Sequence, residues 1–297
     1  MNPKKNDPGL VTTQWLARNL SNPDLRIYDC SVILQPTNEP GQPFAAVSGR
    51  RAFEQAHIPR AQFLDVPGEL SAPTPPGSRL TLSFPERTQL EEVMRAKGLN
   101  QDNMAVLYST SASMWATRVW WILRAYGFTN AAVLDGGFPK WSVERRETTG
   151  TVESPPVGDF VAAPRNDDMV ATREDVLCAI DSDSSAIIDS LSCAMYRGRA
   201  DNYYGRPGHI KSAKNVSVVE ELHDSDTNCF ISLAAAQRIY DERGLDKSRT
   251  VISYCGGGIA ATVNAFMLTR LGYENVAIYD NSMNEWGFDE SLPMDAP

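Results

Sequence analysis

The sequence predicts an α/β protein made of two tandem domains, each a mainly parallel sheet flanked by helices. Two observations predict this fold: a series of landmarks occurs twice in the same order, and each copy alternates strand patterns with helical patterns. The length of 297 residues is too great for one average domain and comfortable for two. A repeat this long indicates a duplicated domain rather than a solenoid.

The landmarks recur at similar spacings in the two halves of the chain. Each copy has a His-Ile motif, a Gly-Leu pair, a Tyr followed by Ser or Cys, a second Gly and a final Asp and Trp. In the first copy these are His57, Gly98, Ser109, Gly127, Asp135 and Trp141, and in the second His209, Gly244, Cys255, Gly272, Asp280 and Trp286. We therefore expect domains at residues 9–146 and 168–295, joined by a linker at residues 148–158.

Each copy reads as alternating strands and helices. Strands are predicted by short apolar runs at residues 26–29, 104–108, 186–189 and 250–254. Helical patterns at residues 85–97 and 233–243 are each closed by a Gly in C-cap position. A Pro-rich stretch at residues 71–77 is expected to be a surface loop of the first domain.

Composition narrows the function classes. The chain is 42% hydrophobic, and its formal net charge is -9. This balance speaks against nucleic acid or an anionic membrane as a partner, and an anionic substrate would need a local positive pocket. No apolar run follows Lys4 and Lys5, and no stretch approaches the roughly 20 apolar residues of a membrane helix. We expect a soluble, cytoplasmic protein.

The cysteine and histidine usage argues against a disulfide framework and against a metal site. The five cysteines are an odd, scattered number without a CxxC pair: Cys30, Cys178, Cys193, Cys229 and Cys255. The three histidines are not at metal-ligand spacing. Since the chain also lacks a Walker-type loop, a Rossmann glycine pattern and a zinc signature, we expect neither a metal nor another cofactor.

The loop after the last predicted strand has a composition suited to chemistry. Cys255 ends that strand, and before the next helix come Gly256, Gly257, Gly258, Ile259 and Ala260. Ligands bind at the carboxyl ends of strands in open α/β sheets, and glycines leave backbone N–H groups unobstructed. A thiol ringed by N–H donors at a helix N-terminus is expected to have a lowered pKa. The same cradle could hold the negative charge of a persulfide.

A buried structural Cys before a glycine turn is the alternative interpretation. For a Cys chosen at random it is the commoner one, and it accounts for the other four cysteines. It accounts less well for Cys255, because the sequence shows no packing reason for three successive glycines.

Six segments of the chain resemble the tandem-domain rhodanese family, which includes thiosulfate sulfurtransferase and 3-mercaptopyruvate sulfurtransferase. The resemblance extends from about Trp15 to Pro293. Its segments are His57-Ile58-Pro59, Arg118-Val119-Trp120-Trp121, Leu134-Asp135-Gly136-Gly137, Gly208-His209-Ile210, Cys255-Gly256-Gly257-Gly258-Ile259 and Glu285-Trp286-Gly287.

The resemblance implies two rhodanese-like domains, of which the first is catalytically inactive and the second carries the active Cys. Ser109 stands in the matching place of the first domain, and a serine hydroxyl cannot serve as a persulfide carrier. In the second domain Cys255 opens a loop through Ala260 that would bind the substrate and the persulfide. The implied reaction moves sulfane sulfur from a small anionic donor, thiosulfate or a mercapto-acid, to a thiophilic acceptor such as cyanide, a thiol or a protein Cys.

The chain departs from both branches of the family near the expected site. Thiosulfate enzymes typically have basic residues after the Cys, where this chain has Gly256 and Gly257. Mercaptopyruvate enzymes typically have a Ser at the place of Gly257, and an Arg pair at the places of Met195 and Asn202. The substrate preference of neither branch can therefore be transferred directly to this chain. We predict a thiosulfate rather than a 3-mercaptopyruvate sulfurtransferase.

Three arginines near the His209 motif are candidates for anion binding, and the histidines are expected to be structural. Arg197, Arg199 and Arg206 could supply positive charge to the donor, although a solvated basic loop is an equal alternative. A structural role is expected for His57 and His209 because the same His occurs in the inactive copy.

Two other function classes remain open. A Cys-loop phosphatase would need an Arg six residues after the Cys to grip phosphate, and that position is Ala261. A non-catalytic rhodanese-like sulfur carrier, or a binding platform for a partner protein, would fit the departures from the family pattern.

Overall fold

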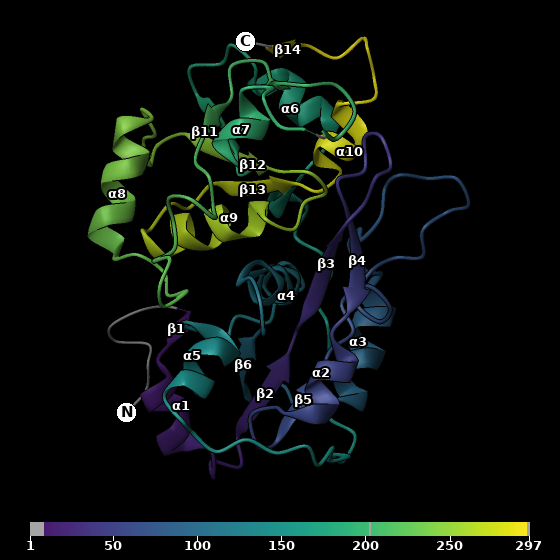
Figure 1. Cartoon of the computed structure of the whole chain (residues 1–297), viewed down its shortest axis with the longest axis vertical. Coiled ribbons are helices and arrows are strands. Elements are labelled where there is room, and N and C mark those ends of the chain that lie inside the picture. The colour runs from purple at the N-terminus through teal and green to yellow at the C-terminus, as the bar shows by residue number, and fades with distance from the viewer. Residues whose placement is uncertain (1–8, 202, 296–297) are drawn as a thin grey trace.

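The computed structural model describes residues 9–201 and 203–295 and shows two α/β domains stacked along the long axis of the molecule (Figure 1). The N-terminal domain forms the lower half in this view and the C-terminal domain the upper half. None of the described helices is long and apolar enough to cross a membrane.

The N-terminal domain is built on a five-stranded parallel sheet. Its strand order is β1 (Leu10–Val11), β7 (Ala131–Leu134), β6 (Met104–Tyr108), β2 (Leu25–Asp29) and β5 (Ala61–Phe63). Helices cover both faces: α1 (Thr13–Asn19), α2 (Arg50–Gln55) and α5 (Gly137–Val143) on one, α3 (Arg87–Ala96) and α4 (Met114–Ala125) on the other.

The C-terminal domain repeats this arrangement with the same strand order. Its parallel sheet runs β8 (Val170–Ala171), β13 (Val276–Tyr279), β12 (Thr250–Tyr254), β9 (Ser185–Asp189) and β11 (Lys214–Asn215). Its helices are α6 (Arg173–Ala179), α7 (Cys193–Tyr196), α8 (Leu233–Glu242), α9 (Ala261–Arg270) and α10 (Ser282–Trp286), with a 3₁₀ turn at Asp167–Met169. The predicted fold of two tandem α/β domains is confirmed.

The elements predicted from the pattern agree closely with those observed. All four predicted strands are present, and α3 and α8 occupy the two predicted helical segments. Gly98 and Gly244 follow these helices with φ of +78° and +71°, the left-handed conformation that favours Gly at a C-cap. The exact domain boundaries stay a prediction.

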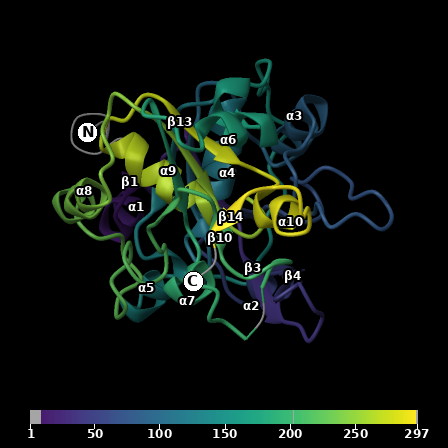
Figure 2. The same ribbon diagram turned by 90° about the horizontal axis from the view of Figure 1, so that it is seen from above.

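An antiparallel ribbon of β3 (Val32–Pro36) and β4 (Phe44–Ser48) extends from the N-terminal domain toward the C-terminal one (Figure 1). Seen from above, the ribbon lies at the side of the molecule (Figure 2). The sequence analysis did not predict it. At its turn, a Cβ on Gly41 would lie 2.7 Å from the Phe288 ring, so the tip of the ribbon touches the C-terminal domain. A second short pair joins β10 (His209–Ile210) to β14 (Met294–Asp295).

Helices α4 and α9 pack against each other and join the two domains into one core. The rings of Trp120 and Phe266 meet edge to face with centroids 4.9 Å apart. The hydroxyls of Thr117 and Thr262, one from each helix, are hydrogen bonded at 2.8 Å. Because one apolar cluster continues through both domains, elements of the N-terminal domain have fixed positions beside the loop that follows β12.

Candidate active site at the end of strand β12

Cys255 directly follows strand β12, at the carboxyl end of the C-terminal sheet. Only 3% of its surface is exposed. The residues after it form a loop that enters helix α9 at Ala261. This is the edge of an open α/β sheet at which ligands bind, so the fold alone marks Cys255 as a candidate.

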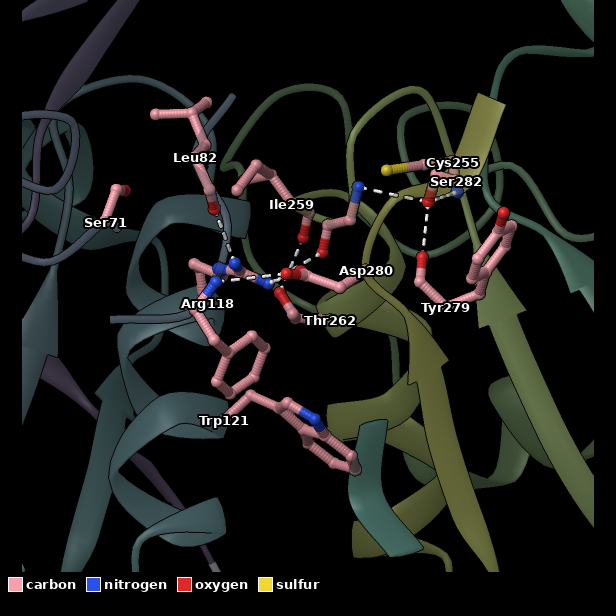
Figure 3. A network of polar contacts seen from close by, with 12 residues as sticks. Ser71, Leu82, Arg118, Trp121, Cys255, Ile259, Thr262, Tyr279, Asp280 and Ser282 are labelled. Atoms are coloured by element: carbon pink, nitrogen blue, oxygen red, sulfur yellow. Dashed lines mark hydrogen bonds and ion pairs between the residues drawn. The ribbon is translucent and has the colours of Figure 1, made fainter. Parts of the chain in front are cut away.

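The side chain of Ser282 anchors the start of the loop (Figure 3). Its Oγ accepts hydrogen bonds from the backbone N–H groups of Cys255 and Gly258, both at 3.1 Å, and donates to the Tyr279 carbonyl at 2.6 Å. Ser282 has a φ of +50°, which is strained for a residue other than Gly. Because the N–H of Gly258 is engaged with this hydroxyl, it is not free to bind a substrate.

Three other backbone N–H groups are directed at the Cys255 sulfur. The amides of Gly257, Ala260 and Ala261 each favour the thiolate and lower its pKa. Burial acts against them and is the largest effect, and the negative charge of Asp189 adds to it, so the pKa of the Cys255 thiol is raised overall. The amide cradle expected from the glycines exists, but the expectation of a lowered pKa is wrong because desolvation outweighs it.

The first two glycines of the loop each make room for a specific side chain. A Cβ on Gly256 would overlap the phenol ring of Tyr204, which therefore lies directly against the backbone beside Cys255. A Cβ on Gly257 would come within 2.8 Å of the Asn284 amide nitrogen. The expectation that packing does not demand successive glycines is therefore wrong, and these packing demands explain why the loop lacks basic side chains.

The third glycine is held against a charged pair that bridges the domains. Gly258 has a φ of +77°, and a Cβ there would overlap Asp280. Arg118, from α4 of the other domain, binds the Asp280 carboxylate at 2.5 Å and donates to the Leu82 carbonyl at 2.6 Å (Figure 3). Asp280 also accepts a hydrogen bond from the Phe84 N–H at 3.1 Å. The N-terminal domain thus braces the back of the loop.

A buried network below the loop fixes the end of strand β12. The Tyr254 hydroxyl donates to the Asp189 carboxylate at 2.7 Å and accepts from the Ile210 N–H at 3.0 Å. Asp189 also accepts from the Leu191 N–H at 2.8 Å. Burial raises the pKa of Asp189 to about 7, against the lowering effect of these hydrogen bonds. The network positions the strand end rather than the reacting atoms.

A cavity of about 770 Å³ opens at Cys255 and is lined by both domains. The N-terminal domain contributes the β3–β4 ribbon, the start of the Pro-rich loop and α4, through residues that include Leu34, Phe44, Pro73 and Trp115. The C-terminal domain contributes Tyr204, Val219, Asn284 and the Cys255 loop. The Pro-rich stretch predicted as a surface loop therefore also forms part of the cavity wall.

The candidate arginines do not line this cavity. Arg197 and Arg199 are exposed elsewhere on the surface. The Arg206 guanidinium donates to four backbone carbonyls of one segment, those of Trp286, Gly287, Asp289 and Leu292. Arg206 thus has a structural role that the sequence did not reveal, and nothing in the cavity geometry supports anion binding by the three.

Of the two positions compared with the family's Arg pair, only one can be placed. Met195 lines the cavity, which is the place expected for a residue at a substrate-binding position. Asn202 lies outside the described residues.

The two paired histidines have equivalent surroundings in the two domains. His57 stacks on Phe53 and its Nδ1 is 2.6 Å from the Phe53 carbonyl. His209 stacks on Tyr196, with its Nδ1 2.8 Å from the Tyr196 carbonyl. Neither is among the residues that line the cavity, which agrees with the structural role expected for both.

No metal or disulfide chemistry is suggested by the side chains that the structure describes. Within residues 9–201 and 203–295, no three His, Cys, Asp or Glu side chains are grouped to hold a metal ion. The five cysteines are all free thiols.

The sequence analysis missed three residues that contact the Cys255 loop: Tyr204, Ser282 and Arg118 as an ion-pair partner. A signal existed for Ser282, since its counterpart in the N-terminal copy is Gly137, and both have a positive φ. Tyr204 had no such signal, because its contact with Gly256 joins segments far apart in the sequence.

Comparison with known proteins agrees with this architecture. The rhodanese-like domain model matches residues 12–144 and 173–288, and the chain belongs to this family. It is similar to the probable 3-mercaptopyruvate sulfurtransferase of Pseudomonas aeruginosa, with 29% identity over 96% of this chain and 97% of that protein. It is also similar to the 3-mercaptopyruvate sulfurtransferase of Escherichia coli K12, with 30% identity over 96% and 97% of the two chains.

A solved structure shows the same fold over most of its length. The crystal structure of SseA from Escherichia coli, described as a 3-mercaptopyruvate sulfotransferase with the rhodanese fold, superposes with a TM-score of 0.78. The two chains are 29% identical, and the match covers 92% of this chain and 98% of that one. The family resemblance inferred from the sequence is confirmed, and sulfur transfer is the activity named for these relatives.

Proposed function

We propose that this protein is a sulfurtransferase that carries sulfane sulfur as a persulfide on Cys255. The observation that supports this most directly is the sulfur of Cys255 at the strand end, with three amide N–H groups directed at it and an open cavity beside it. The amides compensate negative charge on this sulfur or on a second sulfur bound to it. Sulfurtransferase relatives of nearly the same length support the same conclusion.

The reaction proceeds in two displacements. The Cys255 thiolate attacks the outer sulfur of the donor, an S–S bond forms, and with thiosulfate the bond to the sulfonate sulfur breaks as sulfite leaves with the electron pair. An acceptor nucleophile then attacks the outer sulfur of the persulfide, and Cys255 leaves as a thiolate. The neighbouring amides stabilise the negative charge at each stage, and no external oxidant or reductant is consumed.

Intact mass measurement after incubation with a donor tests this function. Wild-type protein should gain about 32 Da, the mass of one sulfur, and lose it again on addition of cyanide. The Cys255→Ser variant should gain nothing, while the Cys193→Ser variant serves as a matched control and should behave as wild type. If neither thiosulfate, 3-mercaptopyruvate nor inorganic polysulfide adds a sulfur, Cys255 is not a sulfur carrier.

The choice between the two donors stays a prediction. We propose thiosulfate over 3-mercaptopyruvate, because Met195 offers no charge to a carboxylate and thiosulfate has no keto acid group to orient. The two relatives compared above carry the mercaptopyruvate name instead. Steady-state comparison of the two donors with cyanide as acceptor decides it, since a higher kcat/KM for 3-mercaptopyruvate would contradict our preference.

The alternative function, a non-catalytic sulfur carrier or a binding platform for a partner protein, is tested by the same steady-state assay. Multiple turnovers with a small donor and acceptor would exclude a purely passive module. A thiophilic acceptor, which is cyanide, a thiol or a protein Cys, and a cytoplasmic location are proposed together with the enzyme function.

A further inference from the structure

The cavity at Cys255 has no charged side chain among the lining residues that the structure describes. None of the described residues that line it is Asp, Glu, Lys, Arg or His, although the chain has 28 Lys and Arg and 37 Asp and Glu in all. Its walls are mostly apolar, with Leu34, Phe44, Pro73, Trp115 and Val219 among them. Away from the backbone amides around Cys255, an anion in this cavity therefore finds no cationic side chain among the described lining residues to compensate its charge.

Three of the basic side chains that are close in sequence to the cavity walls are engaged elsewhere. Arg118 lies behind the loop, where Asp280 neutralises it. Arg206 is directed at backbone carbonyls, and the Arg79 guanidinium stacks 4.3 Å from the centre of the Phe288 ring. None of these three side chains lines the cavity, so none compensates an anion inside it.

Uncharged polar groups lie beside the sulfur. Tyr204 packs against Gly256 and Asn284 against Gly257, so a phenol and a carboxamide lie beside the Cys255 loop. The walls from the N-terminal domain combine apolar side chains such as Leu34, Phe44 and Pro73 with a few uncharged polar ones, among them Gln42 and Ser71. This lining suits an uncharged molecule with a largely apolar body.

Resting on the sulfurtransferase function above, we propose that the cavity takes an uncharged, largely apolar organic thiol as the sulfur acceptor. An anionic group placed away from the amides at Cys255 would lose its hydration without gaining a counter-charge, whereas an apolar body gains free energy from each part of its surface removed from water. The volume of about 770 Å³ lies in the range of cavities that enclose organic ligands and far exceeds what cyanide needs.

The transfer step balances without another reactant. The acceptor thiol loses its proton to solvent, and its sulfur attacks the outer sulfur of the Cys255 persulfide. The new S–S bond forms as the bond to the Cys255 Sγ breaks, and the electron pair leaves with Cys255 as a thiolate. The product is the persulfide of the acceptor.

Single-turnover kinetics with matched acceptors test the proposal. The Cys255 persulfide is prepared with inorganic polysulfide, verified by its added mass and freed of excess reagent. Its loss is then followed with 2-phenylethanethiol, 2-mercaptoethanol and 3-mercaptopropionate, three alkyl thiols whose remainder is apolar, polar or anionic. The apolar thiol should saturate, and its second-order rate constant should exceed those of the other two by about tenfold or more.

A charge introduced into the cavity should reverse the preference. Met195→Arg places a cation in the lining at a half-exposed position, so reaction with 3-mercaptopropionate should rise about tenfold while that with 2-phenylethanethiol falls. Leu177→Arg adds the same charge on α6, where the side chain is 40% exposed and outside the cavity, and should leave the order of the acceptors as in wild type.

The outcomes separate the two levels of the hypothesis. If no donor adds a sulfur to Cys255, the sulfurtransferase function itself fails. If the persulfide forms and reacts with cyanide, but the anionic thiol is as fast as the apolar one in wild type, the function stands and the apolar acceptor is wrong. An equal response of Met195→Arg and Leu177→Arg would likewise contradict selection by the cavity lining.

Discussion

Strands β6 and β12 have equivalent surroundings at their carboxyl ends, but Ser109 follows the first and Cys255 the second. In both domains a buried Tyr hydroxyl accepts a hydrogen bond from the Ile N–H of the His-Ile motif, Tyr108 from Ile58 at 3.3 Å and Tyr254 from Ile210 at 3.0 Å. Two further equivalent hydrogen bonds cross between the domains, one in each direction. Asp280 accepts from the Phe84 N–H in the N-terminal domain, and its counterpart Asp135 accepts from the Phe230 N–H in the C-terminal domain at 2.9 Å.

What lies above the two strand ends differs. The Ser109 hydroxyl donates to the Ala112 carbonyl of its own loop at 2.6 Å. The C-terminal domain covers that loop, since Asn228 donates to the Ser111 carbonyl and His223 contacts the Ser113 hydroxyl at 2.7 Å. Above Cys255, the matching but longer segment of the N-terminal domain, residues 64–84, contains the Pro-rich loop and forms a cavity wall instead.

The comparison teaches that the duplicated sheet provides the position, and the covering segment decides whether the position can bind anything. Residue identity at the strand end is then the second requirement. The N-terminal copy meets neither requirement, because Ser109 has a hydroxyl where Cys255 has a thiol, and the loop after Ser109 is covered by the other domain whereas the Cys255 loop opens on a cavity.

The largest effect is expected from exchanging the two strand-end residues. Cys255→Ser should abolish sulfur loading, because a serine hydroxyl cannot carry a persulfide. Adding Ser109→Cys to that variant should not restore it, because the loop at residue 109 is covered by the other domain. The measurement is added mass with each donor, and loading of the double variant at residue 109 would show that the covering segment is not the obstacle.

The second prediction concerns the ion pair between Arg118 and Asp280 behind the Cys255 loop. Arg118→Met should lower the free energy of unfolding by about 3–5 kcal/mol, because it leaves the Asp280 carboxylate without its partner in a largely buried site. Denaturant unfolding measures the change. In the Arg118→Met, Asp280→Asn double variant the loss should be clearly smaller, and an equal loss would mean that the cost arises from packing rather than from the unpaired charge.

The third prediction isolates the contact between Gly256 and Tyr204. Gly256→Ala should destabilise the protein by about 1–3 kcal/mol, because its methyl group overlaps the Tyr204 ring. In a Tyr204→Ala background the same substitution should cost much less. Additive losses in the double-mutant cycle would show that the two residues do not meet, and that the glycine is required for another reason.

The fourth prediction concerns Ser282, which anchors the Cys255 loop and whose counterpart in the N-terminal domain is Gly137. Ser282→Gly introduces the residue found at Gly137 and suits the positive φ, but it removes the acceptor for the Cys255 and Gly258 N–H groups. Backbone strain is relieved while two hydrogen bonds are lost, so stability should change by only about 1 kcal/mol. The rate of persulfide formation should fall by about tenfold as the loop loosens. An unchanged rate would remove Ser282 from the positioning machinery.

Much of the fold could be predicted because its signals are local. The strands at residues 104–108 and 250–254 are continuous apolar runs, and the glycines after α3 and α8 mark the helix ends. The role of Tyr204 could not be predicted, since it depends on a contact across about 50 residues of chain. The direction of the Cys255 pKa could not be predicted either, because composition shows the amide donors but not the degree of burial.

The smallest expected effect concerns that pKa. Since burial raises it, the thiolate fraction of Cys255 is depressed at neutral pH and grows as the pH rises beyond the ordinary range of a thiol. Alkylation of Cys255 by iodoacetamide should therefore still accelerate at a pH where the rate with free N-acetylcysteine has levelled off. Peptide mass spectrometry across a pH series measures both rates in one sample. A Cys255 profile that levels off first would mean that the amides of Gly257, Ala260 and Ala261 outweigh burial, and that the active strand end is more polar than its apolar surroundings imply.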